Sequence, residues 1–167
     1  MSQRDLICRI STEIKGADSP KKIFAAILNI FPEAEITEES TTEPSFPMED
    51  KDKFVSLTCN NIEEFIEKIS NQRILDTAMD AMTHNLNENS TWFYISRQAA
   101  LANKIAFNLN HEIPLGGKIK IELSKEDLPL WIEDITWHIG RDEIPRHVGD
   151  DYTMRKDGVS REWFRKN

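Results

Sequence analysis

The sequence predicts a single α+β domain in which helices pack on one face of a largely antiparallel sheet. Segments that alternate apolar and polar residues, such as residues 6–14 and 118–123, indicate half-buried strands. Other segments, such as residues 23–31, repeat apolar residues three and four positions apart, which is typical of an amphipathic helix. The elements follow one another as β-α-β-β-α-α-β-α-β-β-α, and this order favours helices lying against one sheet.

The first elements follow from alternation and from helix boundary signals. Residues 6–14 form the first strand, and residues 16–18 turn the chain. Ser19 is the predicted helix cap, and Pro20 suits the first helical position, where a missing N–H costs nothing. Pro32 ends this helix. An acidic loop separates the next two predicted strands, at residues 34–41 and 54–59.

The middle of the chain predicts two consecutive helices with a break between them. One of the asparagines at 60–61 caps the first helix, whose apolar residues recur at helical spacing up to Ile69. The next apolar residue, Ile74, comes five positions later, and this slip would rotate the apolar face away from one straight helix. We therefore expect a break near residues 70–71, with Asn71 capping the second helix.

The second half of the chain predicts short strands and helices, followed by an extension. A helical turn and a Pro-Leu-Gly-Gly turn separate three strands, at residues 91–95, 104–109 and 118–123. Ser124 and Asp127 resemble a capping box with Asp in place of Glu, and the helix after them reaches about Ile139. Periodicity then disappears. We expect a folded domain over residues 1–139 and a basic, aromatic C-terminal extension over residues 140–167.

Composition is that of a soluble globular protein, with 39% hydrophobic and 30% charged residues. No apolar run approaches the roughly 18 residues of a membrane-spanning helix, and the N-terminus has no signal-peptide pattern. We therefore expect a cytoplasmic protein without membrane contact. Cys8 and Cys59 lie in strand-like runs and suit buried thiols in a reducing compartment. A disulfide between them would require neighbouring strands in suitable geometry.

Charge is unevenly distributed along this chain of net charge -8. Residues 33–52 carry eight acidic side chains against Lys51, whereas residues 140–167 carry seven basic and six acidic ones. An acidic protein repels nucleic acid beyond a Debye length of about 10 Å. Any nucleic acid would therefore have to meet a local basic surface.

Five sequence blocks suggest a family. They occur in order at residues 22–32, 72–78, 93–100, 104–107 and 114–123, and Gln-Arg-Ile-Leu-Asp-Thr-Ala at 72–78 is the most specific. Together they resemble a family of small, mostly archaeal proteins of unassigned biochemistry that are described as RNA-binding. The resemblance covers roughly residues 5–139. It implies a fold like that of a large-subunit ribosomal protein that binds ribosomal RNA.

The sheet supplies the main candidate site. If helices cover the apolar side of the strands, the opposite face presents basic side chains together with Trp92 and Tyr94. Aromatic rings that stack on bases and cations that meet phosphates are how several single-strand RNA readers work. Exposed aromatics equally mark protein interfaces, so the same rings could pack on a partner subunit. The predicted basic residues of this face are Arg9, Lys104, Lys118 and Lys120.

Two further arginines are candidate anion contacts. Arg73 and Asp76 are three apart on a predicted helix and can pair, while Gln72 and Arg73 together could donate to a phosphate. The alternative is a structural pair that ties the helix break to a neighbouring loop. Arg97 opens the short helix after the aromatic strand, where a helix N-terminus favours an anion.

The extension interleaves basic and aromatic residues, which suits either RNA binding or wrapping around the domain. These residues are Arg155, Lys156, Arg161, Arg165 and Lys166 with Tyr152, Trp163 and Phe164.

Catalytic and metal-binding patterns are not found in the sequence. It has no Gly-x-Ser-x-Gly, phosphate loop or dinucleotide fingerprint, and its four histidines lack the spacing of metal ligands. We therefore expect no enzyme, no cofactor and no metal site. The sequence predicts a homodimeric RNA-binding protein, and its rival is a protein-interaction or assembly module that uses the same sheet face.

Overall fold

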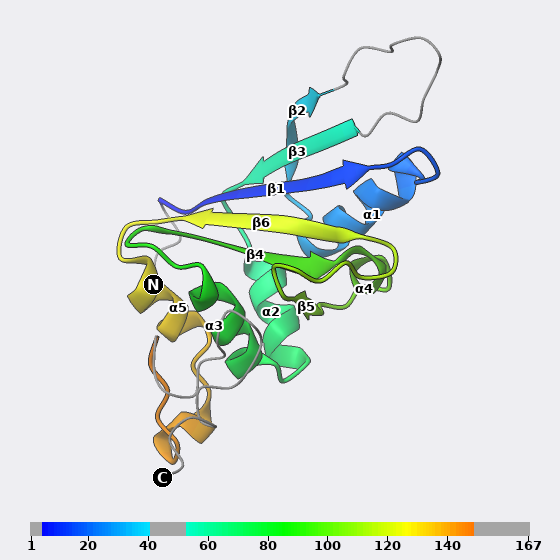
Figure 1. Cartoon of the computed structure of the whole chain (residues 1–167). Coiled ribbons are helices and arrows are strands. Elements are labelled where there is room, and N and C mark those ends of the chain that lie inside the picture. The colour runs from blue at the N-terminus through cyan, green and yellow to red at the C-terminus, as the bar shows by residue number, and fades with distance from the viewer. Residues whose placement is uncertain (1–4, 41–52, 149–167) are drawn as a thin grey trace.

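The computed structural model describes residues 5–40 and 53–148, which form one antiparallel six-stranded sheet with helices on one side (Figure 1). The strand order is β2-β3-β1-β6-β4-β5. The predicted α+β architecture is confirmed. The acidic loop and the aromatic and basic residues of the extension beyond 148 lie outside the described residues. The strands are β1 (Ile7–Ile14), β2 (Glu35–Ser40), β3 (Lys53–Cys59), β4 (Ser90–Ser96), β5 (Phe107–Asn108) and β6 (Lys118–Ser124).

The helices lie behind and below the sheet in the view of Figure 1. At the first helix the boundary signals are confirmed, since the Ser19 hydroxyl accepts the Lys22 backbone N–H at 3.4 Å and Pro20 occupies the first turn. The Asn61 side chain likewise accepts the Glu63 N–H at 3.0 Å. The helices are α1 (Pro20–Ile30), α2 (Glu63–Asn71), α3 (Leu75–His84), α4 (Arg97–Leu101), α5 (Leu128–Ile135) and the 3-10 helix η1 (Ile139–Asp142).

The core lies between the sheet and the helices, and its centre is aromatic. Phe65 of α2 is fully buried, with its ring centroid 5.7 Å from that of Phe31 and 5.9 Å from that of Phe93. Apolar residues at every second position of β1, β3, β4 and β6 face these rings and are buried. Because strand side chains alternate between faces, the other residues of these strands form an outer face that the helices leave uncovered.

The break between α2 and α3 is confirmed, but Asn71 does not cap α3. Instead, Arg73 adopts a left-handed backbone conformation with φ of 59°, and the Ile74 N–H donates back to the Ile69 carbonyl at 3.0 Å. This is the hydrogen bond of a Schellman-type helix end. Helix α3 then begins at Leu75 without a side-chain cap.

Gln72 links the break between α2 and α3 to the backbone of Ile105, in the segment before β5. Its side-chain amide donates to the Ile105 carbonyl at 2.9 Å and accepts the Ile105 N–H at 2.8 Å. The structural alternative for the helix break therefore holds for Gln72. The two bonds provide partners for the backbone N–H and C=O of the buried residue Ile105, which would otherwise lack them.

Two predicted elements are shorter than their sequence patterns indicate. The strand expected at residues 104–109 is limited to the two residues of β5, since residues 102–103 form a turn after α4 and residues 104–106 are irregular. The last helix ends at Ile135 rather than near Ile139. The predicted capping box does not form, because Asp127 is left-handed, with φ of 55°, and makes no side-chain cap bond.

Residues 140–148, the first part of the predicted extension, pack against α3 and α5. Arg141 is buried, and its guanidinium donates to Asp76 at 3.0 Å and to the Thr136 hydroxyl at 3.2 Å. Arg146 pairs with Asp80 at 2.6 Å. Cations from this segment thus hold it against carboxylates of α3.

Cys8 and Cys59 are direct cross-strand partners in β1 and β3, and both are buried free thiols. The hydrogen bond between them, together with burial, raises the pKa of the Cys8 thiol. The strands are therefore neighbours, as a disulfide would require.

Candidate nucleic-acid interface

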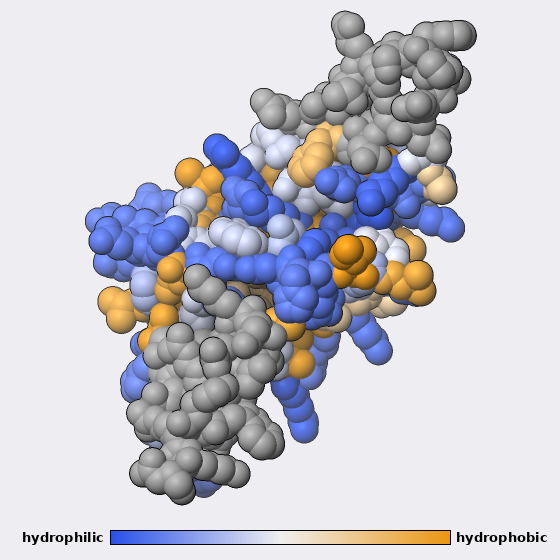
Figure 2. All heavy atoms as spheres, viewed as in Figure 1, coloured by the Kyte–Doolittle hydropathy of each residue, from blue (hydrophilic) through white to orange (hydrophobic). Residues whose placement is uncertain are grey.

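The uncovered sheet face brings together the aromatic and lysine side chains of β4 and β6. Their antiparallel register places Tyr94 opposite Lys120, Ser96 opposite Lys118 and Trp92 opposite Glu122. All of these point away from the helices because their neighbours in sequence fill the core. Figure 2, which looks onto the strands, shows a mostly hydrophilic face with apolar residues toward its margins.

Each lysine of this pair covers an aromatic ring. The Lys118 ammonium lies 4.0 Å from the Tyr94 ring centre, and the Lys120 ammonium lies 5.0 Å from the Trp92 ring. The two rings meet edge to face, with centroids 5.6 Å apart. A cation within about 6 Å of a ring centre is attracted by the ring's electron-rich face. We call these four residues the aromatic–lysine ladder.

The two lysines of the ladder differ in how firmly they are held. The Lys118 ammonium donates to the carbonyls of Asn110 and Glu112, both at 2.9 Å, and pairs with no carboxylate among the described residues. Lys120 instead forms a partly exposed ion pair with Glu122 at 3.2 Å. Such exposed pairs contribute little to stability. Lys120 can therefore turn to a ligand at low cost, whereas Lys118 also fixes a loop.

Asn85 positions the ladder from the edge of the sheet. Its side-chain amide donates to the Trp92 carbonyl and to the Asn110 side chain, both at 3.0 Å, and its oxygen accepts the Asn110 amide at 2.9 Å. One asparagine thus links strand β4 to the loop that holds Lys118.

Arg9 lies on the same face, as predicted. It is exposed on β1, opposite Thr58 of β3 and Glu122 of β6. Glu13 lies on the same side of β1, four residues further along. The face is consequently polar and mixed in charge, with its basic groups beside carboxylates.

Arg97 was expected as an anion contact, but the structure buries it in the protein. Its guanidinium donates to the Gly116 carbonyl at 2.7 Å, to the Thr12 hydroxyl at 3.2 Å and to Asp18 at 3.1 Å. It also donates to the Glu13 carbonyl. The side chain is nine-tenths buried, because it folds back from the start of α4 across the end of β1. We call this network the Arg97 clamp.

The Pro-Leu-Gly-Gly turn leaves room for the Arg97 guanidinium. Gly116 and Gly117 have φ of +83° and +85°, a region that side chains other than glycine rarely adopt. A Cβ on Gly117 would also collide with the Arg97 guanidinium. The two glycines therefore allow both the turn and the close approach of the clamp.

A cavity of about 460 Å³ opens beside the clamp, at the end of the sheet where β1 ends and β6 begins. Tyr94, Lys118 and Lys120 of the ladder form part of its wall. The remaining wall residues are Ser11, Thr12, Glu13, Lys15, Asp18, Phe54, Arg97, Ile113, Pro114, Gly116 and Gly117.

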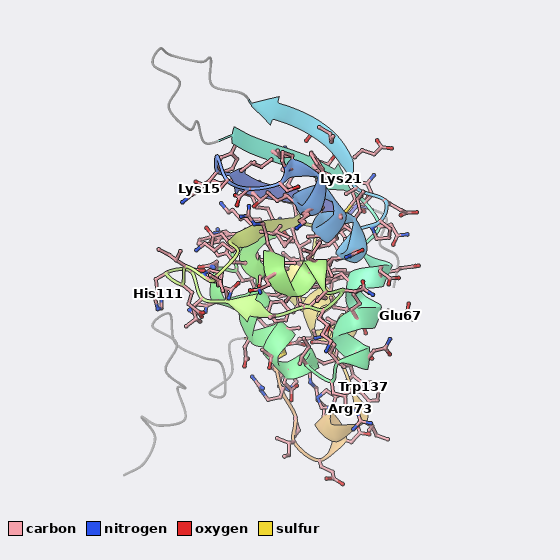
Figure 3. All side chains as sticks on the ribbon, turned by 90° about the vertical axis from the view of Figure 1, so that its right-hand side faces the viewer. Lys15, Lys21, Glu67, Arg73, His111 and Trp137 are labelled. Atoms are coloured by element: carbon pink, nitrogen blue, oxygen red, sulfur yellow. The ribbon has the colours of Figure 1, made fainter. Side chains whose placement is uncertain are left out.

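Lys104 and Arg73 do not join the ladder. Lys104 lies in the irregular segment before β5, because the strand that would have aimed it at the open face is only two residues long. Arg73 lies in the turn between α2 and α3, and Figure 3 shows it at the opposite end of the molecule from Lys15. The structure thus separates both residues from the ladder.

Asp76 does not pair with Arg73, because the turn carries Arg73 off the helix. Its carboxylate meets His138 and Arg141, both at 3.0 Å. Burial alone would raise the pKa of Asp76, but the hydrogen bonds from His138 and Arg141 outweigh it and lower the pKa. Asp76 therefore anchors η1.

Within residues 5–40 and 53–148, no cluster of three or more His, Cys, Asp or Glu side chains could hold a metal ion. No helix in the same ranges is long and apolar enough to cross a membrane.

Comparison with known proteins decides the family. No family model matches the chain. A UPF0201 protein of the archaeon Methanothermobacter thermautotrophicus is 31% identical over 142 residues, which are 85% of this chain and 97% of that protein. This chain belongs to the UPF0201 family. A UPF0201 protein of Sulfurisphaera tokodaii is 30% identical over 128 residues, covering 76% of this chain and 84% of that protein. The family resemblance is confirmed for archaeal proteins without an assigned function.

Solved structures of UPF0201 relatives share this fold. The crystal structure of the Methanococcus jannaschii protein superposes with a TM-score of 0.65 at 26% identity, covering 78% of this chain and 99% of that one. A second UPF0201 crystal structure gives 0.60 at 25% identity, over 92% of this chain and 98% of that one. The α+β sheet with its helices is therefore the family's fold.

Sequence reasoning missed the residues that surround the ladder. Asp18 lay in the predicted turn at residues 16–18, and no contact was predicted for Asn85 or Asn110, yet Asp18 binds Arg97 and Asn85 binds both Trp92 and Asn110. The available signal was the pair of glycines at 116 and 117, which marks a place where something large approaches the backbone. It does not say which side chain arrives.

Replacing Arg97 with lysine should destabilise the fold although the charge is kept. Lysine cannot supply the fork of donors that reaches Gly116, Thr12 and Asp18 together. We expect a loss of about 3 kcal/mol in the free energy of unfolding, measured by urea titration. The exposed change Arg9→Lys serves as the control and should shift stability by about 0.5 kcal/mol or less. Equal stability of the two variants would show that the clamp is not structural.

Asp18→Asn should remove part of the acid sensitivity of the protein. The hydrogen bond from the Lys15 N–H, together with the Arg97 guanidinium, holds the pKa of Asp18 below its usual value against the opposing effect of burial. A pKa that is lower in the folded state stabilises the protein above the unfolded value, and this contribution is lost as pH falls through the folded value. The wild-type advantage over the variant in unfolding free energy should thus be present at pH 7 and shrink below about pH 4. An advantage unchanged down to pH 3 would contradict this account.

Proposed function

We propose that this UPF0201 protein binds RNA through its uncovered sheet face. The aromatic–lysine ladder carries the proposal, because it offers two rings and two ammonium groups within one short stretch of β4 and β6. Unpaired bases stack on such rings, while the ammonium groups meet the phosphates between the bases. Arg9 adds a third cation on the neighbouring strand.

The resemblance to proteins described as RNA-binding, with its implied ribosomal-protein-like fold, supports the same function. The net charge of -8 opposes it at long range. A protein of this charge would bind RNA through short-range contacts at the ladder, and the affinity would be modest and sensitive to salt. Stacking, which salt does not screen, would then carry more of the binding than in a basic protein.

A second candidate is a protein-interaction module, such as a homodimer, that buries the same face. Trp92 and Tyr94 are half-buried rings on an otherwise polar surface, and aromatic residues are enriched in protein interfaces. The mixed charge of the face, with Arg9 and Lys120 beside Glu122, also suits a second copy.

RNA binding should weaken in Lys120→Ala and Trp92→Ala but not in Lys104→Ala. Fluorescence anisotropy of a labelled, unstructured RNA, measured across a salt series, provides the affinities. Loss of Lys120 should lower the slope of log affinity against log salt by about 0.7, the value for one phosphate contact on a single strand. Loss of the Trp92 ring should reduce affinity about tenfold or more without changing the slope. Lys104→Ala is the matched control, since it removes one lysine from outside the ladder.

The absence of binding by the wild type at low salt would contradict an RNA function. Equal losses in Lys104→Ala and Lys120→Ala would instead indicate nonspecific attraction rather than a site on the ladder.

The interaction module predicts a different response from Trp92→Ala. If the ladder is a dimer seam, the wild-type protein should sediment as a dimer, and removing the indole ring should yield monomers. The measurement is sedimentation equilibrium of both proteins at several concentrations. A monomeric wild type, or a dimer that Trp92→Ala leaves unchanged, would exclude the seam from this face.

A further inference from the structure

The cavity at the end of the sheet has walls of two chemical kinds. One part is apolar or aromatic, with Phe54, Tyr94, Ile113 and Pro114. Another part is cationic, and its basic residues are Lys15, Arg97, Lys118 and Lys120. A volume of about 460 Å³ lies within the range of roughly 300–1,000 Å³ that small-molecule sites occupy. Such walls suit a ligand that has a flat, weakly polar part and an anionic part.

Basic residues outnumber acidic ones in the wall of the cavity. Asp18 is committed to Arg97 at 3.1 Å, which leaves Glu13 as the other carboxylate among the wall residues. The lysines of the wall are Lys15, Lys118 and Lys120, and Lys120 pairs with Glu122 outside the wall at 3.2 Å. Lys118 is half-buried, and carbonyl oxygens and the Tyr94 ring are the groups around its ammonium. Among the described residues no carboxylate pairs with Lys118, and a bound anion would provide its counter-charge.

The apolar wall also extends beyond what the fold requires. Ile113 is 92% exposed and Phe54 is 48% exposed, so neither contributes much to the core. Burying such side chains against a ligand would stabilise the complex through the hydrophobic effect. Ile113 belongs to the same turn as Gly116 and Gly117, which the Arg97 clamp holds in place. The position of this turn is therefore fixed by the protein before a ligand binds.

We infer that this cavity binds a single nucleotide that carries a terminal phosphate, with its base against the apolar wall and its phosphate toward the lysines. The cavity shares Tyr94, Lys118 and Lys120 with the ladder, so a strand that crosses the ladder would reach the cavity with its end. For an RNA strand, this inference rests on the proposed RNA function. It adds to that function that the protein recognises the end of an RNA rather than an internal stretch.

The test compares RNA oligonucleotides of one sequence that differ only at their ends. Four forms are needed, with a phosphate or a hydroxyl at the 5′ end and with a phosphate or a hydroxyl at the 3′ end. One phosphorylated form should bind about tenfold more tightly than its hydroxyl partner, since a charge-assisted contact is gained. The free nucleoside monophosphates AMP and UMP should compete with that form, whereas inorganic phosphate at the same concentration should compete much less.

Lys15→Ala is the decisive variant, because Lys15 lines the cavity but is not part of the ladder. Its side chain is exposed, and the backbone N–H that binds Asp18 at 2.9 Å is kept, so the fold should be unaffected. The variant should lose the preference for the phosphorylated end while still binding the hydroxyl-ended RNA. Lys21→Ala, which removes an exposed lysine of α1, is the matched control and should keep the preference.

The possible failures are distinguishable. RNA binding that is indifferent to both end phosphates overturns the cavity inference and leaves the ladder proposal intact. If no RNA binds, nuclear magnetic resonance titration with AMP and UMP decides the cavity by itself. Shifts at Tyr94 and Ile113 that Lys15→Ala abolishes would then support a site for free nucleotides, whereas no shifts, or equal shifts with inorganic phosphate, would overturn it.

Discussion

The Arg97 clamp is the interaction on which the geometry of the candidate site depends. One guanidinium joins the end of β1, the turn before α1 and the turn before β6, through Thr12, Asp18 and Gly116. Residues of all three segments line the cavity. The charge of Arg97 is buried, and a buried charge is tolerated only when it is paired and its donors are satisfied. The residues that satisfy it are consequently held in one arrangement.

The ladder and the clamp represent two uses of cations in one small region. Arg97 has a carboxylate partner and accepting carbonyl oxygens, so groups of the protein itself neutralise its charge. Lys118 has carbonyl and aromatic partners, which orient its ammonium without neutralising it. Lys120 has a carboxylate partner in water, which screens that pair strongly. Arg97 is the most buried of the three and makes the most contacts within the protein, whereas the two half-buried lysines keep more of their charge for a ligand.

The periodic part of the fold was predictable because one rule governs each strand. Alternation placed Trp92 and Tyr94 on one side of β4, and Lys118 and Lys120 on one side of β6, before their neighbours in space were known. The same rule failed at Lys104, since alternation has no meaning where the chain turns after α4. Local sequence could not show that residues 104–106 leave the strand.

Long-range pairing was the part that sequence could not supply. Arg97 donates to Thr12, a residue 85 positions earlier, and Asp76 pairs with Arg141, 65 positions later. For both arginines the local context offered nearer explanations, a helix N-terminus for Arg97 and an unstructured extension for Arg141. The choice between them depends on which strands become neighbours, and the strand order is a property of the whole chain.

Asn85 has a consequence for how this molecule meets other chains. Strand β5 pairs with β4 only at Tyr94 and Ile95, and backbone bonds from Ser96 to Ala106 and from Asn87 to Ser90 cover the two ends of that margin, so the open position lies at Trp92. Open backbone groups at a sheet margin are where a foreign strand can add, the usual start of edge-to-edge aggregation. The Asn85 amide occupies the carbonyl of Trp92 at the point where β5 no longer reaches. A chain that approaches this margin therefore meets a side chain in place of an unpaired backbone group.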